Sequence, residues 1–299
     1  MLGYGGRSSL GIKPKWLKTH LPGGKDYSLV IRTLRELNLH TVCEESRCPN
    51  LGKCFGRRTA TIMILGKVCT RHCHFCSVRP GNPERVDEKE PEKVAQAIKK
   101  LGLKYVVITS VTRDDLEDGG AGQFAETIKA IKRVDAECRV EVLIPDFKGI
   151  EERIEKVISA NPEVIGHNIE TTRALTPVIR DKRASYDLSL TVLRYINQRA
   201  PGIIKKSGLM VGLGETEREV ISALEDLREC DVDIVTIGQY LPPTRFNPPV
   251  KKFYNEAEFN SLTKIGKAIG FKEILAGPLV RSSYQAEEIF KAIINSKSH

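Results

Sequence analysis

Six of the eight cysteines in this sequence fall into two groups of three. The first triplet, with spacing C-x4-C-x5-C, consists of Cys43, Cys48 and Cys54. The second triplet, with spacing C-x3-C-x2-C, consists of Cys69, Cys73 and Cys76. Thiolates at such short spacing are typical ligands for soft metals and for iron-sulfur clusters, so the chemistry of the chain is sought first at these two places.

Each group is a triplet and not a quartet, which bears on the metal that it binds. A structural zinc site uses four protein ligands, usually in C-x2-C pairs. Three thiolates on one loop suit a cubane iron-sulfur cluster that leaves one iron open to a substrate or a cofactor. Zinc held by the second triplet with His72 or His74 is the alternative, but these histidines adjoin cysteines and are poorly aimed to complete a tetrahedron. The sequence therefore predicts two clusters with different tasks.

Composition is typical of an enzyme of the cytoplasm. The chain has 299 residues, 40% hydrophobic and 28% charged, which suits one large domain with extensions. No apolar run approaches the roughly 18 residues of a membrane span, and the first residues lack the apolar stretch of a secretion signal. In a reducing compartment, closely spaced cysteines favour metal over disulfides. We expect a cytoplasmic protein with no membrane segment.

The charge balance is moderately basic, with 47 basic and 38 acidic residues and a net charge of +9. Such an excess can attract nucleic acid or an acidic protein by long-range steering. The sequence has no RNA-binding signature, and aromatic residues make up only 6% of it. We therefore expect an acidic protein partner and no nucleic acid.

The elements that position the cysteines are apolar runs alternating with amphipathic segments. Strands are predicted at residues 60–65, 105–110, 139–145, 164–170, 206–213 and 233–241. Helices are predicted at residues 91–101, 122–134, 149–160, 185–200 and 216–230. Alternation implies a parallel sheet with right-handed crossovers, and the absence of a Gly-x-Gly-x-x-Gly fingerprint favours a barrel over a doubly wound sheet. The predicted fold is α/β, a partial (β/α)6 TIM-like barrel with N-terminal and C-terminal extensions.

Three regions are expected along the chain. Residues 1–58 form an N-terminal extension with one helix at 28–37 and the first triplet. Residues 59–255 form the barrel. Residues 256–299 add a helix, an apolar run at 273–279, an Arg-Ser-Ser-Tyr segment and a polar tail.

Unusual polar segments follow the predicted strands, at the end of the barrel where catalytic residues gather. The second triplet follows the first strand, and residues 109–115 follow the second. Residues 167–170 end the fourth strand, and residues 212–215 end the fifth. One face of the barrel is therefore expected to collect most of the chemistry.

The C-x3-C-x2-C loop after the first strand of a partial barrel resembles that of the radical S-adenosylmethionine (SAM) superfamily. The resemblance implies that the amino and carboxylate groups of SAM chelate the open iron. It also implies that an electron from the cluster cleaves the sulfonium to give a 5'-deoxyadenosyl radical, which removes hydrogen from unactivated carbon.

The first triplet, in the run CEESRCPNLGKC, closely resembles the auxiliary-cluster motif of the lipoyl synthase family. Other segments look like landmarks of the same family, at residues 13–17, 109–116, 167–171, 210–216 and 281–284. The resemblance covers nearly the whole chain. Its most specific part is the two triplets together with Arg-Ser-Ser-Tyr at 281–284.

The resemblance implies sulfur insertion at C6 and C8 of an octanoyl chain that is amide-linked to a lysine of a carrier protein. The implied cofactors are two 4Fe-4S clusters and SAM, with one radical for each carbon and the auxiliary cluster as the sulfur source. The implied partners are octanoylated lipoyl carrier proteins, namely lipoyl domains of 2-oxoacid dehydrogenases and the glycine cleavage H protein. An electron donor such as ferredoxin or flavodoxin is also implied.

Carried over by position, Ser283 is the fourth ligand of the auxiliary cluster. A hard oxygen ligand matches iron-sulfur chemistry less well than thiolate, so we expect one iron to leave as the cluster gives up sulfur. Arg281 is expected to neutralise the auxiliary cluster or to steer Ser283, and a solvated surface charge is the alternative. Ser282 and Tyr284 are left open between a functional and a structural role.

Five polar residues at strand ends are candidates to bind SAM. They are Thr109, Ser110, Arg113, Asn168 and Glu170. Glu170 is expected to accept hydrogen bonds from the ammonium group or the ribose hydroxyls, and the residues after the second strand to line the carboxylate pocket. Helix caps or salt bridges are the structural alternative. The two isolated cysteines, Cys138 and Cys230, are expected to be small buried hydrophobes.

Other functions were weighed against this one. A biotin-synthase-like enzyme or a methylthiotransferase also uses two clusters, but the added RNA-binding domain of the latter is missing. A non-catalytic electron-transfer protein and a zinc-binding interaction module have no use for the strand-end motifs. Iron and sulfide analysis separates these classes, since roughly eight of each fits two cubanes and zinc without sulfide excludes the enzyme.

Overall fold

The computed structural model describes residues 22–296, so the segment at 13–17 lies outside the described residues. Its centre is an eight-stranded sheet in the order β1-β2-β5-β6-β7-β8-β9-β10. The strands are β1 (His40–Thr41), β2 (Thr61–Ile64), β5 (Tyr105–Ser110), β6 (Arg139–Leu143), β7 (Val164–Gly166), β8 (Ile204–Val211), β9 (Ile234–Gln239) and β10 (Glu273–Gly277). All neighbouring pairs from β2 to β10 are parallel, and only β1 pairs antiparallel, with β2.

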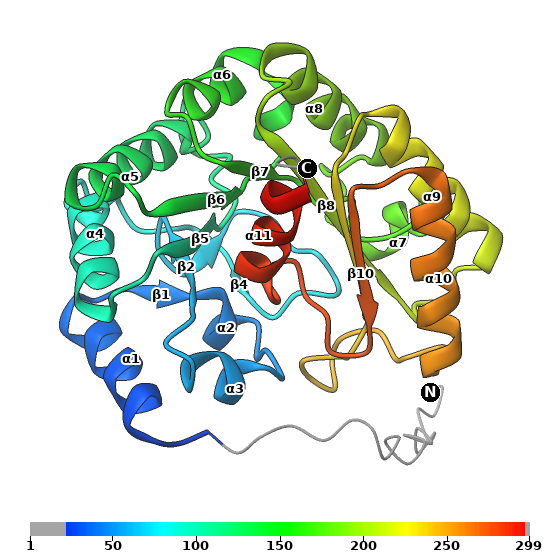
Figure 1. The fold of residues 1–299 in the computed structure, drawn as a ribbon, viewed down its shortest axis with the longest axis horizontal. Helices are drawn as coiled ribbons and strands as arrows, with labels where there is room; N and C mark the ends of the chain where they lie inside the picture. Colours follow the sequence, from blue (N-terminus) through cyan, green and yellow to red (C-terminus); the bar gives the residue numbers. More distant parts are fainter. Residues whose placement is uncertain (1–21, 297–299) are drawn as a thin grey trace, which may run out of the picture.

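Helices cover the outer face of this curved sheet (Figure 1). They are α1 (Lys25–Glu36), α4 (Glu90–Leu101), α5 (Ala121–Val134), α6 (Glu151–Ser159), α8 (Tyr186–Arg199), α9 (Glu217–Glu229) and α10 (Glu256–Ile269). Short elements lie between them: α2 (Val42–Glu45), α3 (Leu51–Phe55), β3 (Val68–Cys69), β4 (Arg79–Pro80), the 3-10 turn η1 (Phe147–Gly149) and α7 (Thr176–Ile179). Within the described residues, β10 and β1 end the sheet without pairing to each other, so the barrel is open.

The alternation predicted from the sequence is confirmed. Each of the six predicted strands and five predicted barrel helices is present, with ends shifted by a few residues. The sheet is wider than expected because β1 and β10, from the two extensions, add to its ends. The division of the chain at residues 58 and 255 stays a prediction.

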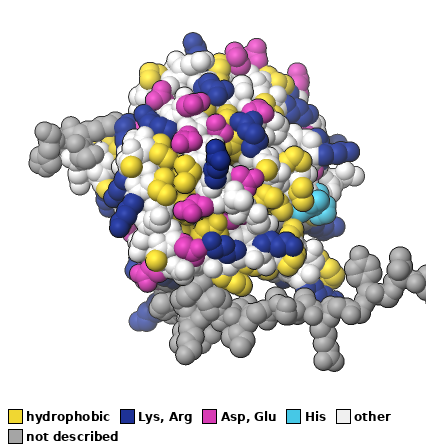
Figure 2. Space-filling view, turned by 90° about the vertical axis from the view of Figure 1, so that its right-hand side faces the viewer, with side chains coloured by type: hydrophobic (Ala, Val, Ile, Leu, Met, Phe, Trp, Pro, Cys, Tyr) yellow, Lys and Arg dark blue, Asp and Glu magenta, His cyan; other side chains and the backbone are white. Residues whose placement is uncertain are grey.

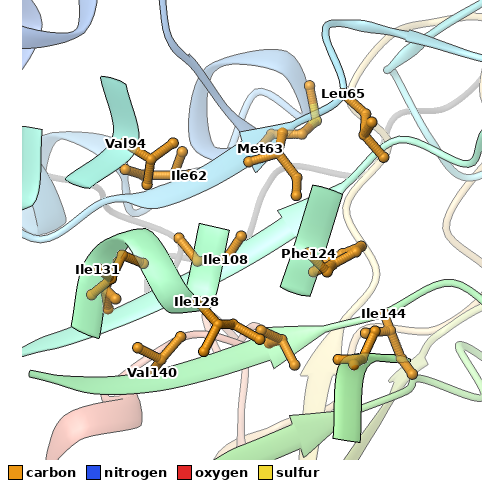
Figure 3. Close-up of a cluster of buried hydrophobic side chains, with 14 of the residues drawn as sticks. Ile62, Met63, Leu65, Val94, Ile108, Phe124, Ile128, Ile131, Val140 and Ile144 are labelled. Carbon is orange, nitrogen blue, oxygen red and sulfur yellow. The ribbon is translucent and has the colours of Figure 1, made fainter. Parts of the chain in front are cut away.

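The main core lies between the sheet and its outer helices. Figure 3 shows apolar side chains of the strands, such as Ile108 and Val140, facing Phe124, Ile128 and Ile131 of α5. The helix presents these residues on one side because they recur at intervals of three and four. This packing fixes the outer face of the strands, and therefore which of their residues point inward.

The C-terminal helix α11 (Ala286–Ser296) lies inside the curve of the sheet (Figure 1). Its Ile289 and Ile293 pack with Val164 and Ile204, and the ring of Phe290 lies 5.5 Å from that of Tyr105. The polar tail expected after residue 284 was therefore wrong. The apolar residues of this short helix were overlooked among its charges, and they fill one end of the barrel.

A charged cluster also lies on the inner face of the curved sheet. Lys206 Nζ lies 2.7 Å from Glu141 Oε1, and Tyr105 donates a hydrogen bond of 2.5 Å to Glu141 Oε2. Lys206 and Glu141 have side chains only 3% exposed. Buried charges are stable only when paired, so these three strands are held in one register by the match of their side chains.

No helix within residues 22–296 is long and apolar enough to cross a membrane. Figure 2 views the molecule from the side of α9 and α10, where basic and acidic side chains are interspersed among apolar ones. The excess of basic residues is therefore not gathered into one large patch on this face.

Candidate cluster and cofactor site

The second triplet lies on the loop that leaves β2, at the carboxyl end of the sheet. The short pair β3 and β4 closes the base of the loop, where Gly81 N donates to the Cys69 carbonyl at 2.9 Å. Thr70 N donates to the Thr112 carbonyl at 3.0 Å, and His74 N to the Ile179 carbonyl at 2.9 Å. The loop is thus tied to the ends of β5 and α7, which fixes its path over the barrel mouth.

Arg71, within the second triplet, anchors the loop by a buried ion pair. Its guanidinium donates to Asp114 at 2.8 and 3.0 Å and to Asp146 at 2.5 and 2.8 Å. The Arg71 side chain is 5% exposed and that of Asp146 1%. Burial acts to raise the pKa of Asp146, but the hydrogen bonds and charge of Arg71 outweigh it and hold that pKa below its usual value. The planar fork of arginine suits two carboxylates at once.

A second anchor comes from the segment after α7. Asp181 accepts from the backbone N–H of His72 at 2.8 Å, and its own backbone N–H donates to Cys73 Sγ at 3.3 Å. Arg183 donates to Asp181 at 2.8 Å and to the Thr70 carbonyl at 2.7 Å. The backbone of the loop is therefore hydrogen-bonded on both sides of Cys73.

The thiols of the second triplet are partly buried and close enough to influence one another. Burial raises the pKa of Cys76 to about 12, a hydrogen bond from Val78 opposes this, and the charges of Cys73 and Cys69 raise it further. Burial also raises the pKa of Cys73, against the hydrogen bond from Asp181. A metal that binds these thiols has to displace their protons, and it would then replace water as the partner of their charge.

The first triplet lies on two short helices outside the barrel mouth. Cys43 is in α2, Cys54 is in α3, and Cys48 lies between them. Burial raises the pKa of Cys43 to about 12, and the charge of Cys48 adds to this. Burial raises the pKa of Cys54 to about 11, again with a contribution from Cys48. The three thiols therefore form one group.

Ser283 reaches this group from the other end of the chain. Thr61, the first residue of β2, donates a hydrogen bond of 2.7 Å to Ser283 Oγ. The backbone and side chain of Thr61 are also close enough to the Cys43 thiol to act to lower its pKa, against the larger effect of burial. The structure thus places Ser283 close to the first triplet, through Thr61, and its role as a cluster ligand stays a prediction.

Arg281 lies beside the same group. The charge of Arg281 acts to lower the pKa of Cys48, and the charge of the Cys48 thiolate acts to raise the pKa of Arg281, as expected for neighbours of opposite charge. Burial is the larger effect at Arg281 and lowers its pKa. The one hydrogen bond of its guanidinium within residues 22–296 is to the adjacent Val280 carbonyl, at 2.6 Å. The remaining donors of the guanidinium are thus available to an anion.

Residues that sequence reasoning missed join the two ends of the chain here. Asn50 Nδ2 donates to the Leu279 carbonyl at 2.6 Å, and Lys53 Nζ donates to the Tyr284 hydroxyl at 2.8 Å. Thr61 was missed as well, although a hydroxyl in an otherwise apolar strand was a usable signal. Asn50 and Lys53 carried no signal beyond lying within the first triplet, since their partners are far away in the sequence.

The two triplets lie next to each other. Ser77, which follows Cys76, donates a hydrogen bond of 2.5 Å to the carbonyl of Glu45, which lies between Cys43 and Cys48. The charge of Glu170, at the end of β7, acts on the thiols of Cys73 and Cys76. Both triplets therefore border the same end of the barrel.

The cysteine triplets are not arranged around a single metal ion in the described part of the chain. Across residues 22–296, no group of three or more His, Cys, Asp or Glu side chains is arranged to hold a metal ion. In a cubane each thiolate binds a different iron, so its ligands are spread more widely than those of one ion. All eight cysteines are free thiols. His74 Nδ1 lies 2.7 Å from the Val178 carbonyl.

The candidates at and after the end of β5 differ in whether their side chains already have hydrogen-bond partners in the protein. Thr109 donates to the Leu143 carbonyl at 3.0 Å, and Arg113 is paired with Asp115 at 2.8 Å. These two therefore have the structural contacts that were the alternative to a binding role. Ser110 Oγ is buried and has no hydrogen-bond partner among the described residues. A buried hydroxyl without a partner at a strand end fits a ligand contact.

Glu170 and Asn168 lie together at the end of β7. Asn168 Nδ2 donates to Glu170 Oε1 at 3.1 Å, and no cation within residues 22–296 lies at ion-pair distance from this carboxylate. Burial raises the pKa of Glu170, while the charge of Arg180 acts to lower it. Glu170 has a left-handed backbone with φ of 68°, an unfavourable state for a residue other than glycine. A partly buried carboxylate with one hydrogen-bond partner fits a cationic ligand such as the ammonium group of SAM.

Both ring nitrogens of the buried His167 have partners within the protein. Its Nδ1 lies 2.9 Å from the Ile144 carbonyl and its Nε2 3.0 Å from Ser189 Oγ, which also accepts from Arg180 at 2.9 Å. Because a carbonyl only accepts, the Nδ1 atom carries the proton. Burial lowers the pKa of His167 to about 4, and the charge of Arg180 acts in the same direction.

This histidine predicts a loss of stability in mild acid. Between pH of about 4 and 6.5, the unfolded chain holds a proton on His167 that the folded chain lacks, so stability falls as the pH falls through this window. From pH 7 to pH 5 the expected loss is roughly 2 kcal/mol. We expect His167→Gln, which hydrogen-bonds but does not titrate, to remove most of this loss. Urea unfolding of both proteins at the two pH values measures it, and parallel losses would contradict the assignment.

Family models match most of the chain. One described as the Radical SAM superfamily matches residues 63–227, and one described as the N-terminal domain of lipoyl synthase of the radical SAM family matches residues 6–48. A lipoyl synthase of Rubrobacter xylanophilus is 53% identical over 276 residues, which are 92% of this chain and 86% of that protein. A lipoyl synthase of Caldicellulosiruptor saccharolyticus is 50% identical over 281 residues, 94% of this chain and 98% of that protein.

Solved structures support the fold alone. The structure of a methylornithine synthase has a TM-score of 0.55 and 16% identity, covering 83% of this chain and 77% of that one. The FeFe-hydrogenase maturase of Carboxydothermus hydrogenoformans also has a TM-score of 0.55 and 16% identity, covering 91% of this chain and 71% of that one. The open parallel barrel is thus shared with proteins of distant sequence.

Proposed function

The chain belongs to the lipoyl synthase family of the radical SAM superfamily, and we propose that its two cysteine triplets divide the reaction of that family between two clusters. Lipoyl synthase inserts two sulfur atoms into a protein-bound octanoyl chain, and membership in the superfamily brings one 4Fe-4S cluster and SAM. The second cluster, the individual ligands and the named partners are the proposal. The observation that carries it is the group formed by Cys43, Thr61 and Ser283.

The second triplet is proposed to hold the cluster that binds SAM. When SAM is bound there, this cluster supplies the electron that generates the 5'-deoxyadenosyl radical. The chain itself provides rigidity: Arg71 and Asp181 fix the loop on both sides of Cys73. Glu170 is proposed to accept hydrogen bonds from the ammonium group, because its partly buried carboxylate has a single hydrogen-bond partner, Asn168.

The other candidates for SAM binding receive different roles. Ser110 is proposed to contact the methionine part of SAM, since its buried hydroxyl lacks a partner in the described structure. Thr109 and Arg113 are proposed to shape the pocket from behind, because both side chains are already hydrogen-bonded to neighbouring protein groups.

The first triplet, with Ser283 as fourth ligand, is proposed to hold the auxiliary cluster, which supplies the sulfur. Thr61 holds the Ser283 hydroxyl at 2.7 Å and keeps it beside Cys43. Arg281 offsets the negative charge of the thiolates, as its effect on the pKa of Cys48 indicates. Asn50 and Lys53 fasten the C-terminal segment over the triplet.

The partners are proposed on chemical grounds. Lipoyl synthases act on octanoylated carrier proteins, and we propose lipoyl domains of 2-oxoacid dehydrogenases and the glycine cleavage H protein as carriers here. Ferredoxin or flavodoxin is proposed as the electron donor. The cytoplasm is the proposed compartment, because all eight cysteines are free thiols and clusters need a reducing environment.

The test is an anaerobic assay with an octanoylated carrier peptide, SAM and a chemical reductant. Mass spectrometry of the peptide follows the reaction, and 5'-deoxyadenosine is measured in the same samples. We expect the octanoyl group to gain two sulfur atoms. Deoxyadenosine without sulfur transfer would indicate another radical reaction. If neither deoxyadenosine nor the sulfur-containing peptide formed, the proposal would be contradicted.

Ser283→Cys tests the proposed fourth ligand. Thiolate is a softer ligand than an oxygen donor, so the variant is expected to keep roughly eight iron atoms per chain and to slow sulfur transfer by about tenfold or more. Iron analysis and single-turnover kinetics with the octanoyl peptide give the two quantities. Unchanged turnover would argue that Ser283 is not a ligand that has to be released.

A further inference from the structure

The segment that carries Ser283 is a tight turn. Tyr284 N donates to the Arg281 carbonyl at 2.9 Å, which closes residues 281–284 into a β-turn. A hydrogen-bonded turn of four residues moves largely as one unit. A displacement of Ser283 is therefore carried to the residues on either side of it.

Three consecutive side chains of this turn reach three different parts of the molecule. Ser283 Oγ accepts from Thr61 on β2 at 2.7 Å, and the Tyr284 hydroxyl accepts from Lys53 on α3 at 2.8 Å. Ser282 Oγ instead accepts from Asn168 Nδ2 at 2.7 Å, at the end of β7. Ser282 thus points to the SAM-binding candidates, while its neighbours point to the first triplet.

The contact of Ser282 continues to Glu170. Asn168 has one amide nitrogen, and it donates to both Ser282 Oγ at 2.7 Å and Glu170 Oε1 at 3.1 Å. Glu170 acts in turn on the thiols of Cys73 and Cys76. A continuous chain of covalent and hydrogen bonds therefore joins Ser283 to Glu170, whose charge acts on the second triplet.

The surroundings leave little room for independent movement. A Cβ atom added to Gly208 would lie 3.3 Å from Ser282 Oγ, 3.1 Å from Asn168 Oδ1 and 2.6 Å from Thr236 Oγ1. The Gly208 carbonyl also accepts from Glu170 N at 3.0 Å. Only a glycine on β8 lets these groups approach so closely, so a shift of Ser282 has to move Asn168 or break its hydrogen bond.

We propose that Ser282 is a positioning residue that couples the two sites. A movement of Ser283 at the first triplet displaces Ser282, which displaces Asn168 and, through it, Glu170. The inference rests on the proposed function, because it takes Ser283 as a cluster ligand and Glu170 as a contact of SAM. Ser283 held at the cluster and Ser283 released place the turn differently, and Asn168 then orients the Glu170 carboxylate differently. SAM affinity is therefore linked to the state of the auxiliary site.

The experiment is a double-mutant cycle on SAM affinity. Anaerobic equilibrium dialysis gives the Kd of SAM for the two-cluster wild type, Ser283→Ala, Ser282→Ala and the double variant. We expect Ser283→Ala to change the Kd by about fivefold or more in the wild-type background, the usual size of coupling between linked sites. In the Ser282→Ala background the same substitution is expected to leave the Kd unchanged.

Electron paramagnetic resonance of the reduced cluster gives a second readout that is independent of turnover. The spectral change on SAM addition is expected to differ between wild type and Ser283→Ala. It is expected to be the same in Ser282→Ala and in the double variant. Iron content is measured for every variant. Ser283→Cys takes the place of Ser283→Ala if the alanine variant loses iron.

Tyr284→Phe is the matched control, because it removes a hydrogen bond from the same turn and leaves the Asn168 contact intact. Ser283→Ala is expected to keep its effect on the Kd in this background. An equal effect in the Ser282→Ala background, or none in the wild type, would overturn the coupling alone. Failure of the wild type to bind SAM would instead overturn the proposed function.

Discussion

Cys76→Ala is expected to abolish 5'-deoxyadenosine formation and to lower the iron content from roughly eight to about four per chain. The three thiols of the second triplet are partly buried and lie in one group at the carboxyl end of the barrel, and no other free cysteine is proposed to replace Cys76. Without a third thiolate the cluster has too few protein ligands to persist while one iron stays open. Anaerobic reconstitution, iron and sulfide analysis and product chromatography measure both effects.

Cys54→Ala is the matched variant in the first triplet. This variant is expected to lose a similar amount of iron and all sulfur transfer. It is expected to keep SAM cleavage, because Cys54 and the other ligands proposed for the auxiliary cluster lie outside the loop of the second triplet. Cys230→Ala, at a residue 1% exposed in the helical layer, controls for the loss of any thiol. If Cys54→Ala and Cys76→Ala lost deoxyadenosine equally, the division of tasks between the triplets would be wrong.

Arg71→Ala is expected to lower the free energy of unfolding by roughly 3–5 kcal/mol, because it leaves the buried Asp146 carboxylate without an ion-pair partner. It also removes the nearest cation of Asp114, which keeps Arg183 at 3.4 Å and Lys148 at 3.9 Å. Asp146 and Asp114 accept all four of the arginine hydrogen bonds to carboxylates, and their side chains are 1% and 11% exposed. Total stabilities of about 5–15 kcal/mol make this a large fraction. Urea unfolding followed by circular dichroism measures it.

The same variant is expected to lose iron from the second triplet, since Arg71 lies between Cys69 and Cys73 and fixes their loop. Arg199→Ala is the control, as its ion pair with Glu155 is at the surface, with side chains 55% and 35% exposed. Exposed pairs contribute about 0–1 kcal/mol, so this variant should remain near wild type. An equally small effect for Arg71→Ala would show that the buried pair is not what holds the loop.

Much of the fold was predictable from the sequence because its signals are local. Apolar residues of α5 recur at helical spacing and pack on the sheet, as Ile128 and Ile131 do in Figure 3. The isolated cysteines Cys138 and Cys230 are 0% and 1% exposed, which confirms their expected burial. The helix α11 was missed, because its short apolar stripe is interrupted by charges and is recognised only against the inner face of the strands.

The two triplets are a property of the sequence itself, because their ligands lie within a few residues of each other and the spacing of thiols on one loop limits what they can bind. Resemblance placed Ser283 with them, but only the folded chain shows what holds it there. Thr61 and Ser283 are separated by 222 positions and meet at 2.7 Å because the chain returns through β10 to the inside of the sheet. Contacts of this kind, including those of Arg71 and Ser282, depend on the packing of distant strands, and no local spacing encodes them.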